Sequence, residues 1–133
     1  MTLTPDPANT TVQAEPAVIP EHMVILLLEG GQRLLVQIAE AIGGGDSRLR
    51  DHILRKVLTI LGELHRCLNH EQGGTLVDNL IRLYEWWRSE IFDASNKGDV
   101  ERLNRVRAQM GDIRQAWEQV LFQGEGMSES PVV

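Results

Sequence analysis

Cysteine and positive charge are both scarce in this chain of 133 residues. Its one cysteine, Cys67, cannot form an intramolecular disulfide, and a single thiol excludes a cysteine-rich metal site. The 13 basic residues are outnumbered by 19 acidic ones, which gives a formal net charge of −6. An acidic chain is not attracted to phosphate backbones or to anionic lipid. We therefore expect neither a nucleic-acid partner nor a membrane partner.

Long apolar runs are missing as well. The longest covers only residues 23–28, whereas a helix needs about 20 apolar residues to cross a bilayer. The first ten residues lack both the basic stretch and the apolar stretch of a secretory signal peptide. The expected location is the cytosol.

Patterns that carry catalytic or metal chemistry are also missing from the sequence. No glutamate is followed by histidine three residues later, as a di-iron centre in a helical bundle would require. The metalloprotease pattern that His70 begins is broken by the glycines that follow it. His65, Cys67 and His70 are close in sequence, but their spacing does not place all three on one helical face. We expect no enzyme activity, no metal site and no cofactor.

Apolar residues recur every three or four positions in four segments that are separated by glycine. This period predicts helices at about 20–42, 46–71, 75–96 and 99–122. Asp46 and Asp99 are suitable caps for the second and fourth helices, and Thr75 with Asp78 is similar to a capping box at the start of the third. Connections this short make consecutive helices antiparallel. The predicted fold is all-α, an antiparallel up-down four-helix bundle over 19–122, with a disordered arm at 1–18 and a disordered tail at 123–133.

The apolar positions that share one face of each helix are assigned to the core. They are Val24, Leu27, Leu28, Leu34, Leu35, Ile38 and Ile42; Leu49, Ile53, Val57, Ile60, Leu64 and Leu68; Leu76, Leu80, Leu83, Trp87 and Ala94; and Val100, Leu103, Val106, Met110, Ile113, Trp117 and Leu121. Gly30 and Gly31 interrupt the first stripe and predict either a close helix contact or a kink there. Trp86 points about 100° away from Trp87 and should be partly exposed.

The second and third helices have apolar residues outside these core faces. The additional positions are Leu54, Leu58, Leu61 and His65 on the second helix, and Val77, Ile81, Tyr84 and Phe92 on the third. If the two helices are neighbours, these rows are the walls of a groove that binds a partner's helix. Two alternatives stay open. The first helix or the arm covers the rows and makes them core, or the rows form the face of a homodimer.

Five segments carry a resemblance to a known family. They are PEHMVILLLEGGQRLL at 20–35, ELHRCLNHEQGG at 63–74, TLVDNLIRLYEWW at 75–87, ASNKGDVERL at 94–103 and IRQAW at 113–117. Their order and spacing resemble those of the flagellar secretion chaperone FliS family, over about residues 19–121. The chain departs from the family in its first 18 residues, which contain no aromatic where the family has a tyrosine-containing segment. Leu28 and Asn69 also stand where the family often has tyrosine and aspartate.

The resemblance implies a four-helix bundle that binds newly made flagellin in the cytosol. The implied partners are the C-terminal segment of flagellin, which is disordered when free and helical when bound, and the flagellar export gate. Binding would prevent premature polymerisation and help delivery for export. A self-associating structural or regulatory bundle with no flagellin client is the alternative.

Overall fold

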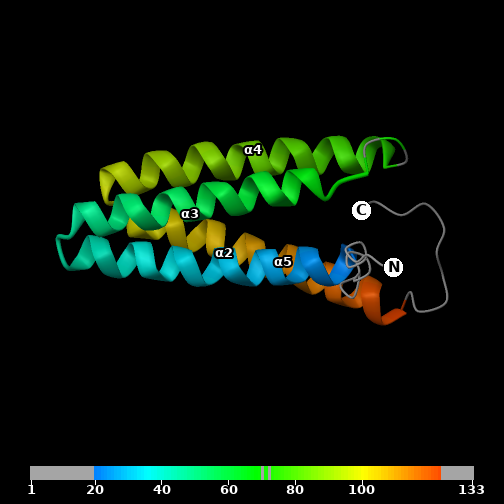
Figure 1. Cartoon of the computed structure of the whole chain (residues 1–133), viewed down its shortest axis with the longest axis horizontal. Coiled ribbons are helices and arrows are strands. Elements are labelled where there is room, and N and C mark those ends of the chain that lie inside the picture. The colour runs from blue at the N-terminus through cyan, green and yellow to red at the C-terminus, as the bar shows by residue number, and fades with distance from the viewer. Residues whose placement is uncertain (1–19, 70, 72, 124–133) are drawn as a thin grey trace, which may run out of the picture.

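The computed structural model of the chain describes residues 20–69, 71 and 73–123, and these residues form four helices and no strand. The helices are α2 (Pro20–Gly43), α3 (Ser47–Arg66), α4 (Gly74–Lys97) and α5 (Val100–Gln123). They run up and down in one elongated bundle (Figure 1), so the predicted all-α four-helix fold is confirmed. The predicted arm at 1–18 lies outside the described residues, and so does the predicted tail except for Gln123, which ends α5.

Each helix contacts two neighbours around the bundle. α2 packs against α3 and α5, α4 packs against the same two helices, and α2 meets α4 across the core. The face formed by α3 and α4 is therefore opposite the face formed by α2 and α5. The described chain begins and ends at the same end of the bundle, where α3 also connects to α4 (Figure 1). The two shortest connections, α2 to α3 and α4 to α5, are at the other end.

Aspartate side chains begin α3 and α5, as predicted. The Asp46 carboxylate accepts a hydrogen bond from the Leu49 N–H at 3.0 Å, and the Asp99 carboxylate accepts one from the Arg102 N–H at 3.3 Å. Each cap satisfies a helix N–H that has no partner within the helix. The start of α4 differs from the prediction, because Gly73 is its N-cap and Thr75 makes no capping bond.

Glycines in the left-handed conformation end the two helices that lead into the short turns. Gly45 has φ of 72° and Gly98 has φ of 68°. The amide after each glycine donates to a carbonyl five residues back, at 2.9 Å in both turns. This is the Schellman arrangement, which satisfies helix carbonyls and reverses the chain within a few residues.

α3, the second of the four predicted helices, ends at Arg66, about five residues earlier than predicted. The Cys67 N–H donates to the carbonyls of Glu63 and Leu64, and the Leu68 N–H donates to that of His65. Bonds to carbonyls three residues back tighten the last turn and close the helix.

The core is built from the predicted stripes together with several residues outside them. The side chains that are fully enclosed include Trp87, Leu28, Leu35, Ile38, Leu64, Leu103 and Met110. Leu49 and Leu76 were assigned to the core but are 45% and 51% exposed. Both lie in the first turn of a helix at an end of the bundle, where the neighbouring helices give less cover. Ile91 is fully buried and was not predicted.

The two glycines inside α2 mark close helix contacts. A Cβ atom added to Gly30 would lie 3.3 Å from the Ile60 Cδ1 atom, and one added to Gly31 would lie 3.1 Å from the Met110 sulfur. α2 therefore approaches α3 at Gly30 and α5 at Gly31. The helix is continuous through both, so the close contact and not a helix break accounts for them.

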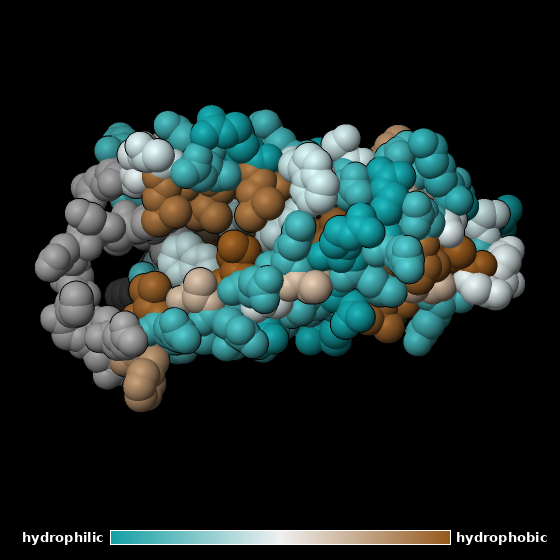
Figure 2. Space-filling view, turned by 180° about the vertical axis from the view of Figure 1, so that it is seen from behind, coloured by the Kyte–Doolittle hydropathy of each residue, from teal (hydrophilic) through white to brown (hydrophobic). Residues whose placement is uncertain are grey.

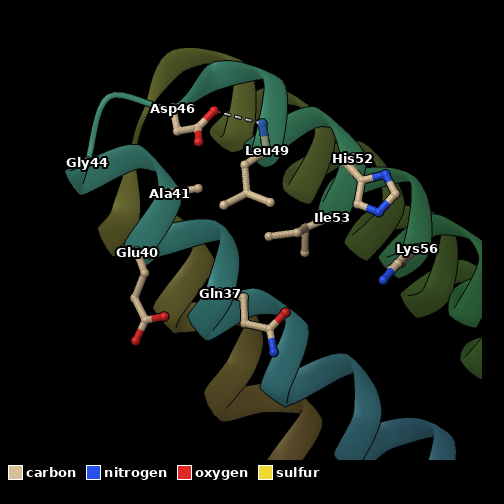
Figure 3. A pocket seen from close by; sticks show the side chains of 9 residues that line it. All are labelled: Gln37, Glu40, Ala41, Gly44, Asp46, Leu49, His52, Ile53 and Lys56. Atoms are coloured by element: carbon tan, nitrogen blue, oxygen red, sulfur yellow. Dashed lines mark hydrogen bonds between the residues drawn. The ribbon is translucent and has the colours of Figure 1, made fainter.

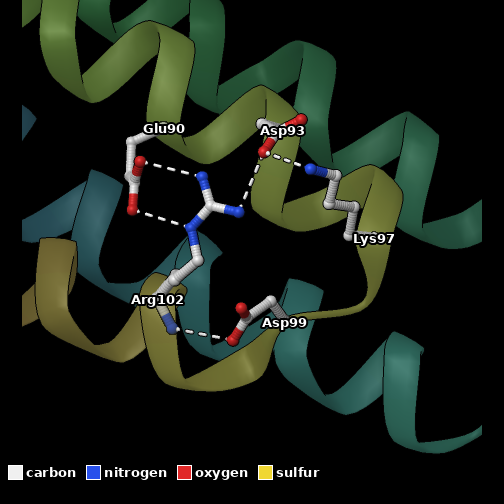
Figure 4. A network of polar contacts seen from close by, with 5 residues as sticks. All are labelled: Glu90, Asp93, Lys97, Asp99 and Arg102. Atoms are coloured by element: carbon white, nitrogen blue, oxygen red, sulfur yellow. Dashed lines mark hydrogen bonds and ion pairs between the residues drawn. The ribbon is translucent and has the colours of Figure 1, made fainter.

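An ion-pair network joins α4 to α5 near their connecting turn (Figure 4). The Arg102 guanidinium donates two hydrogen bonds of 2.9 Å to Glu90 and one of 2.8 Å to Asp93. Lys97 lies 3.2 Å from the same Asp93 carboxylate. These hydrogen bonds hold the pKa values of Glu90 and Asp93 below their ordinary range.

Candidate partner-binding surfaces

The structure divides the eight predicted partner-binding residues into two groups. Buried residues, each no more than 5% exposed, are Leu54, Leu61, Val77 and Tyr84. Residues that reach the surface are Leu58, His65 and Ile81, which are half-buried, and Phe92, which is 52% exposed. A helix that touches two neighbours needs a wider apolar arc than one facing a single partner. The first four residues are therefore core in the isolated chain, and only the other four are positioned to meet a partner.

The four residues that reach the surface follow the seam between α3 and α4. The Arg88 guanidinium donates to the Leu58 carbonyl at 3.3 Å, so the Arg88 side chain reaches across this seam from α4 to α3. His65 is seven residues after Leu58 and Ile81 is seven before Arg88, so each lies on the same face of its helix as the residue that marks the seam. We call Leu58, His65, Ile81 and Phe92 the α3–α4 surface.

Tyr84 lies beneath this seam with an unusual hydroxyl group. The ring packs on Trp87 with centroids 5.6 Å apart, and the hydroxyl is buried with no hydrogen-bond partner among the described residues. Burial raises the pKa of the Tyr84 hydroxyl far above its ordinary value. The group stays protonated and neutral, so it supplies no acid–base chemistry.

Cys67 is half-buried beside the same region. Burial raises the pKa of its thiol, and the nearby Glu63 carboxylate adds to the effect. A thiol with a raised pKa is a poor nucleophile. Within the described ranges no three histidine, cysteine, aspartate or glutamate side chains are grouped to hold a metal ion, and His70 lies outside those ranges. None of the described helices is long and apolar enough to cross a membrane.

A second apolar surface occupies the end of the bundle where α2 begins and α5 ends. Five of the nine large apolar side chains that the described residues expose are located there: Met23, Leu26, Leu76, Val120 and Phe122. α4 and α5 diverge toward this end, and Figure 2 shows apolar side chains gathered between them. We call these five residues the terminal apolar surface. The sequence prediction missed it, although Val120 and Phe122 lie outside the α5 stripe and could have indicated it.

A pocket of about 500 Å³ lies between the second half of α2 and the first half of α3 (Figure 3). Ala41 and Ile53 form its apolar floor, while Asp46 and Lys56 bring opposite charges to its rim. The polar groups do not converge on a common point in Figure 3. The pocket is a depression between two helices, and it lacks the convergent polar side chains of a catalytic site.

Comparisons with known proteins assign the chain to a family. A sequence model of the family described as "Flagellar protein FliS" matches residues 8–124. The flagellar secretion chaperone FliS of Vibrio cholerae is 32% identical over 104 residues, which cover 78% of this chain and 76% of that protein. The flagellar secretion chaperone FliSB of Pseudomonas aeruginosa is 29% identical over 99 residues, covering 74% and 79%. The FliS chaperone of Salmonella typhimurium is 26% identical over 117 residues, covering 85% and 87%.

These relatives are named as chaperones, which is a non-enzymatic role and agrees with the prediction that the chain is not an enzyme. The family model spans all four helices and both apolar surfaces. On this ground the chain belongs to the FliS family of flagellar proteins.

Proposed function

We propose that the chain is a cytosolic export chaperone of the flagellar type III system. It binds the C-terminal segment of flagellin, prevents premature polymerisation and aids delivery to the export gate. The observation that carries this proposal is the family match over residues 8–124, together with relatives named flagellar secretion chaperones. A secretion chaperone needs a client, and the resemblance of the sequence motifs to the family points to flagellin.

The exposed apolar surfaces support a client that folds when it binds. A disordered segment loses conformational entropy on becoming helical, and burial of apolar area offsets that loss. The α3–α4 surface offers a seam between antiparallel helices, which suits an amphipathic helix. The terminal apolar surface adds five exposed side chains at one end of the bundle. A client in contact with both surfaces would extend along the bundle and around its end.

Titration calorimetry with a peptide of the flagellin C-terminal segment tests the proposal directly. The expected result is a one-to-one complex that forms at micromolar concentrations or below. Binding should be accompanied by a negative heat-capacity change, because apolar surface is buried. If the cognate flagellin gives no binding heat at micromolar concentrations, the flagellin assignment is wrong.

Leu58→Glu and Ile81→Glu test the placement of the client. Both side chains are half-buried on the α3–α4 surface, so a carboxylate there would be desolvated under a bound helix. Each variant should weaken binding by at least about tenfold, equivalent to about 1.4 kcal/mol. Leu49→Glu is the matched control, because Leu49 is 45% exposed on the same helix but lies at its far end. Circular dichroism and thermal melting would show whether each variant is folded, and unchanged binding by both folded variants would exclude this surface.

Self-association through the exposed apolar residues is the second candidate function. The terminal apolar surface favours it, because exposed apolar side chains gathered at one end of a bundle often mark an interface. Sedimentation of the chain with and without flagellin separates the two functions. A stable dimer that ignores flagellin supports self-association, whereas a monomer that forms a one-to-one complex supports the chaperone.

A further inference from the structure

A cluster of arginines lies on the α2–α5 face, on the side of the bundle opposite the α3–α4 surface. A shallow depression of about 430 Å³ there is lined by Glu29, Gln32, Arg33, Val36, Arg107 and Arg114. Three cationic side chains thus surround it against one anionic side chain, in a chain whose net charge is −6. The local charge is opposite in sign to that of the whole molecule.

Gln32 holds the polar groups of this depression in place. Its side-chain amide donates to the Arg107 carbonyl at 3.2 Å, and its oxygen accepts from Arg114 Nε at 3.1 Å. Gly111 on α5 makes room for it, because a Cβ atom there would lie 2.9 Å from Gln32 Nε2. Arg114 also pairs with Glu118 at 2.9 Å and with Glu29 at 3.8 Å. The Arg114 side chain is therefore positioned before any partner arrives.

The other two arginines have unused donors. Arg107 Nε is buried and has no hydrogen-bond partner among the described residues. Arg33 is exposed, and neither it nor Arg107 forms an ion pair within the described part of the chain. Burial keeps Arg107 Nε away from a docked segment, but the terminal nitrogens of the guanidinium are not buried, and such a group presents its donors in a fork that matches a carboxylate. The depression is therefore complementary to carboxylate groups.

We propose that the depression is a docking site for the carboxylates of an acidic protein segment. Arg107 and Arg114 are seven residues apart on α5, which is two helical turns or about 10.5 Å. Acidic residues seven apart on a helix laid along the groove would reach Arg107 and the Nη2 group of Arg114, which makes no hydrogen bond or ion pair among the described residues. Val36, 38% exposed at the rim, adds an apolar contact that suits a polypeptide. The depression is open and shallow, so it does not enclose a small anion.

This site leaves the opposite face of the bundle uncovered. A segment docked between α2 and α5 would not touch the α3–α4 surface, since the two faces are on opposite sides of the bundle. The chain could then hold an acidic partner and another partner together. The docking site depends only on the α2–α5 geometry, so its test does not require the flagellin assignment to be correct.

The probe is a helical alanine–glutamine peptide with glutamates at two positions seven residues apart. Nitrogen-15 NMR of the full chain should show the Nε–Hε signals of Arg33, Arg107 and Arg114 moving as this peptide is added. The shifts should largely disappear at 0.5 M salt, because screening then acts over a few ångströms. A matched peptide with glutamine in place of both glutamates should cause no such shifts. The net negative charge of the chain repels acidic peptides elsewhere, which makes a local response informative.

Substitutions on the chain identify the arginines that are responsible. Arg33→Gln combined with Arg107→Gln should weaken peptide binding at least tenfold. Arg48→Gln combined with Arg55→Gln changes the net charge equally on the exposed face of α3 and should leave binding unchanged. Because Arg107 is partly buried, the exposed Arg33→Glu serves as a second variant whose folding is not at risk.

Three outcomes would overturn the proposal. The first is unchanged binding to folded Arg33→Glu, and the second is equal or absent binding by the acidic and neutral peptides. The third is a response of the three arginines to inorganic phosphate but not to the acidic peptide. That last result would assign the depression to a free anion and not to a protein segment.

Discussion

The buried hydroxyl of Tyr84 is a polar group that the fold encloses without giving it a partner. The residue is 3% exposed, and its hydroxyl makes no hydrogen bond within the described residues. Tyr84→Phe removes only that oxygen and keeps the ring on Trp87. We expect the free energy of unfolding to stay the same or to rise by up to about 2 kcal/mol. Urea unfolding followed by tryptophan fluorescence measures this, and a clear loss of stability would mean that the hydroxyl has a partner in solution.

Two helix-interior glycines should respond in opposite directions to the same substitution. Gly62→Ala places a methyl group 3.9 Å from the Arg88 guanidinium, so the helix gains stability of about 1 kcal/mol without a clash. Gly31→Ala places one 3.1 Å from the sulfur of the fully buried Met110. Overpacking there should exceed the gain in helix propensity and destabilise the chain by up to about 2 kcal/mol. Thermal denaturation of the two variants checks the sign of each change, and stabilisation by both would mean that α2 and α5 are less closely packed than described.

Single residues could be predicted from the sequence where the cause is local. Asp46 and Asp99 were found as caps because a cap depends only on neighbours three residues away. Leu49 and Leu76 were assigned wrongly, because their exposure depends on how far the neighbouring helices extend past them. The periodicity of apolar residues contains no information on how far the neighbouring helices extend.

At the level of helices, the Arg102 network should make the joint between α4 and α5 sensitive to acid. Hydrogen bonds from Arg102 lower the pKa values of Glu90 and Asp93 in the folded chain. Their stabilisation is therefore complete above the ordinary carboxyl values of about 4 and is lost as pH falls through the lowered folded values. Arg102→Gln should be less stable than the parent at pH 6, and the difference should shrink at pH 3.

Urea midpoints at several pH values measure this difference. Arg55→Gln, a substitution of an exposed arginine on α3, controls for the change in net charge. A difference between Arg102→Gln and the parent that stays constant from pH 6 to pH 3 would show that the network does not depend on ionised carboxylates.

The extra apolar rows on α3 and α4 show the limit of reading one helix at a time. Leu54 and Leu61 were set apart from the α3 core face, yet both are buried because α3 packs against α2 and α4 together. On α4, Tyr84 and Ile91 are seven residues apart and are buried for the same reason, because α4 packs against α3 and α5 together. The sequence predicted which helices carry wide apolar arcs. It could not predict how much of each arc the neighbours cover, because that depends on the packing of the helices.

For the whole molecule, the terminal apolar surface should account for most of the chain's binding of apolar dyes and most of its self-association. Leu26→Gln combined with Phe122→Gln removes two of its most exposed side chains, at 56% and 84%. We expect lower binding of an apolar fluorescent dye and less self-association, with stability changed by no more than about 0.5 kcal/mol per site. Leu49→Gln, at an isolated exposed leucine, should have little effect on dye binding. Equal dye binding by the double variant and the parent would show that these residues are covered in solution.

The fold class was predictable from the sequence because the four apolar stripes and the glycines between them indicate the same four helices. The divergence of α4 and α5 was not, since it arises from the way the helices pack along their whole length. The only indication of this divergence in the sequence was apolar residues of α5 outside its main stripe, such as Val120 and Phe122. The assignment of the partner site to α3 and α4 stays a prediction, and the sequence analysis did not identify the end of the bundle where most of the exposed apolar side chains gather.

The position of the two ends of the described chain has a mechanical consequence. Pro20 and Gln123 leave the bundle at the same end, on the neighbouring helices α2 and α5. A force that pulls these ends apart would peel α2 from α5 starting at that end and would load only a turn or two of contacts at once. The glycine turns at the far end would be loaded last. A bundle tethered in this way should unzip at low force, whereas the same helices pulled from opposite ends would have to slide past one another all at once.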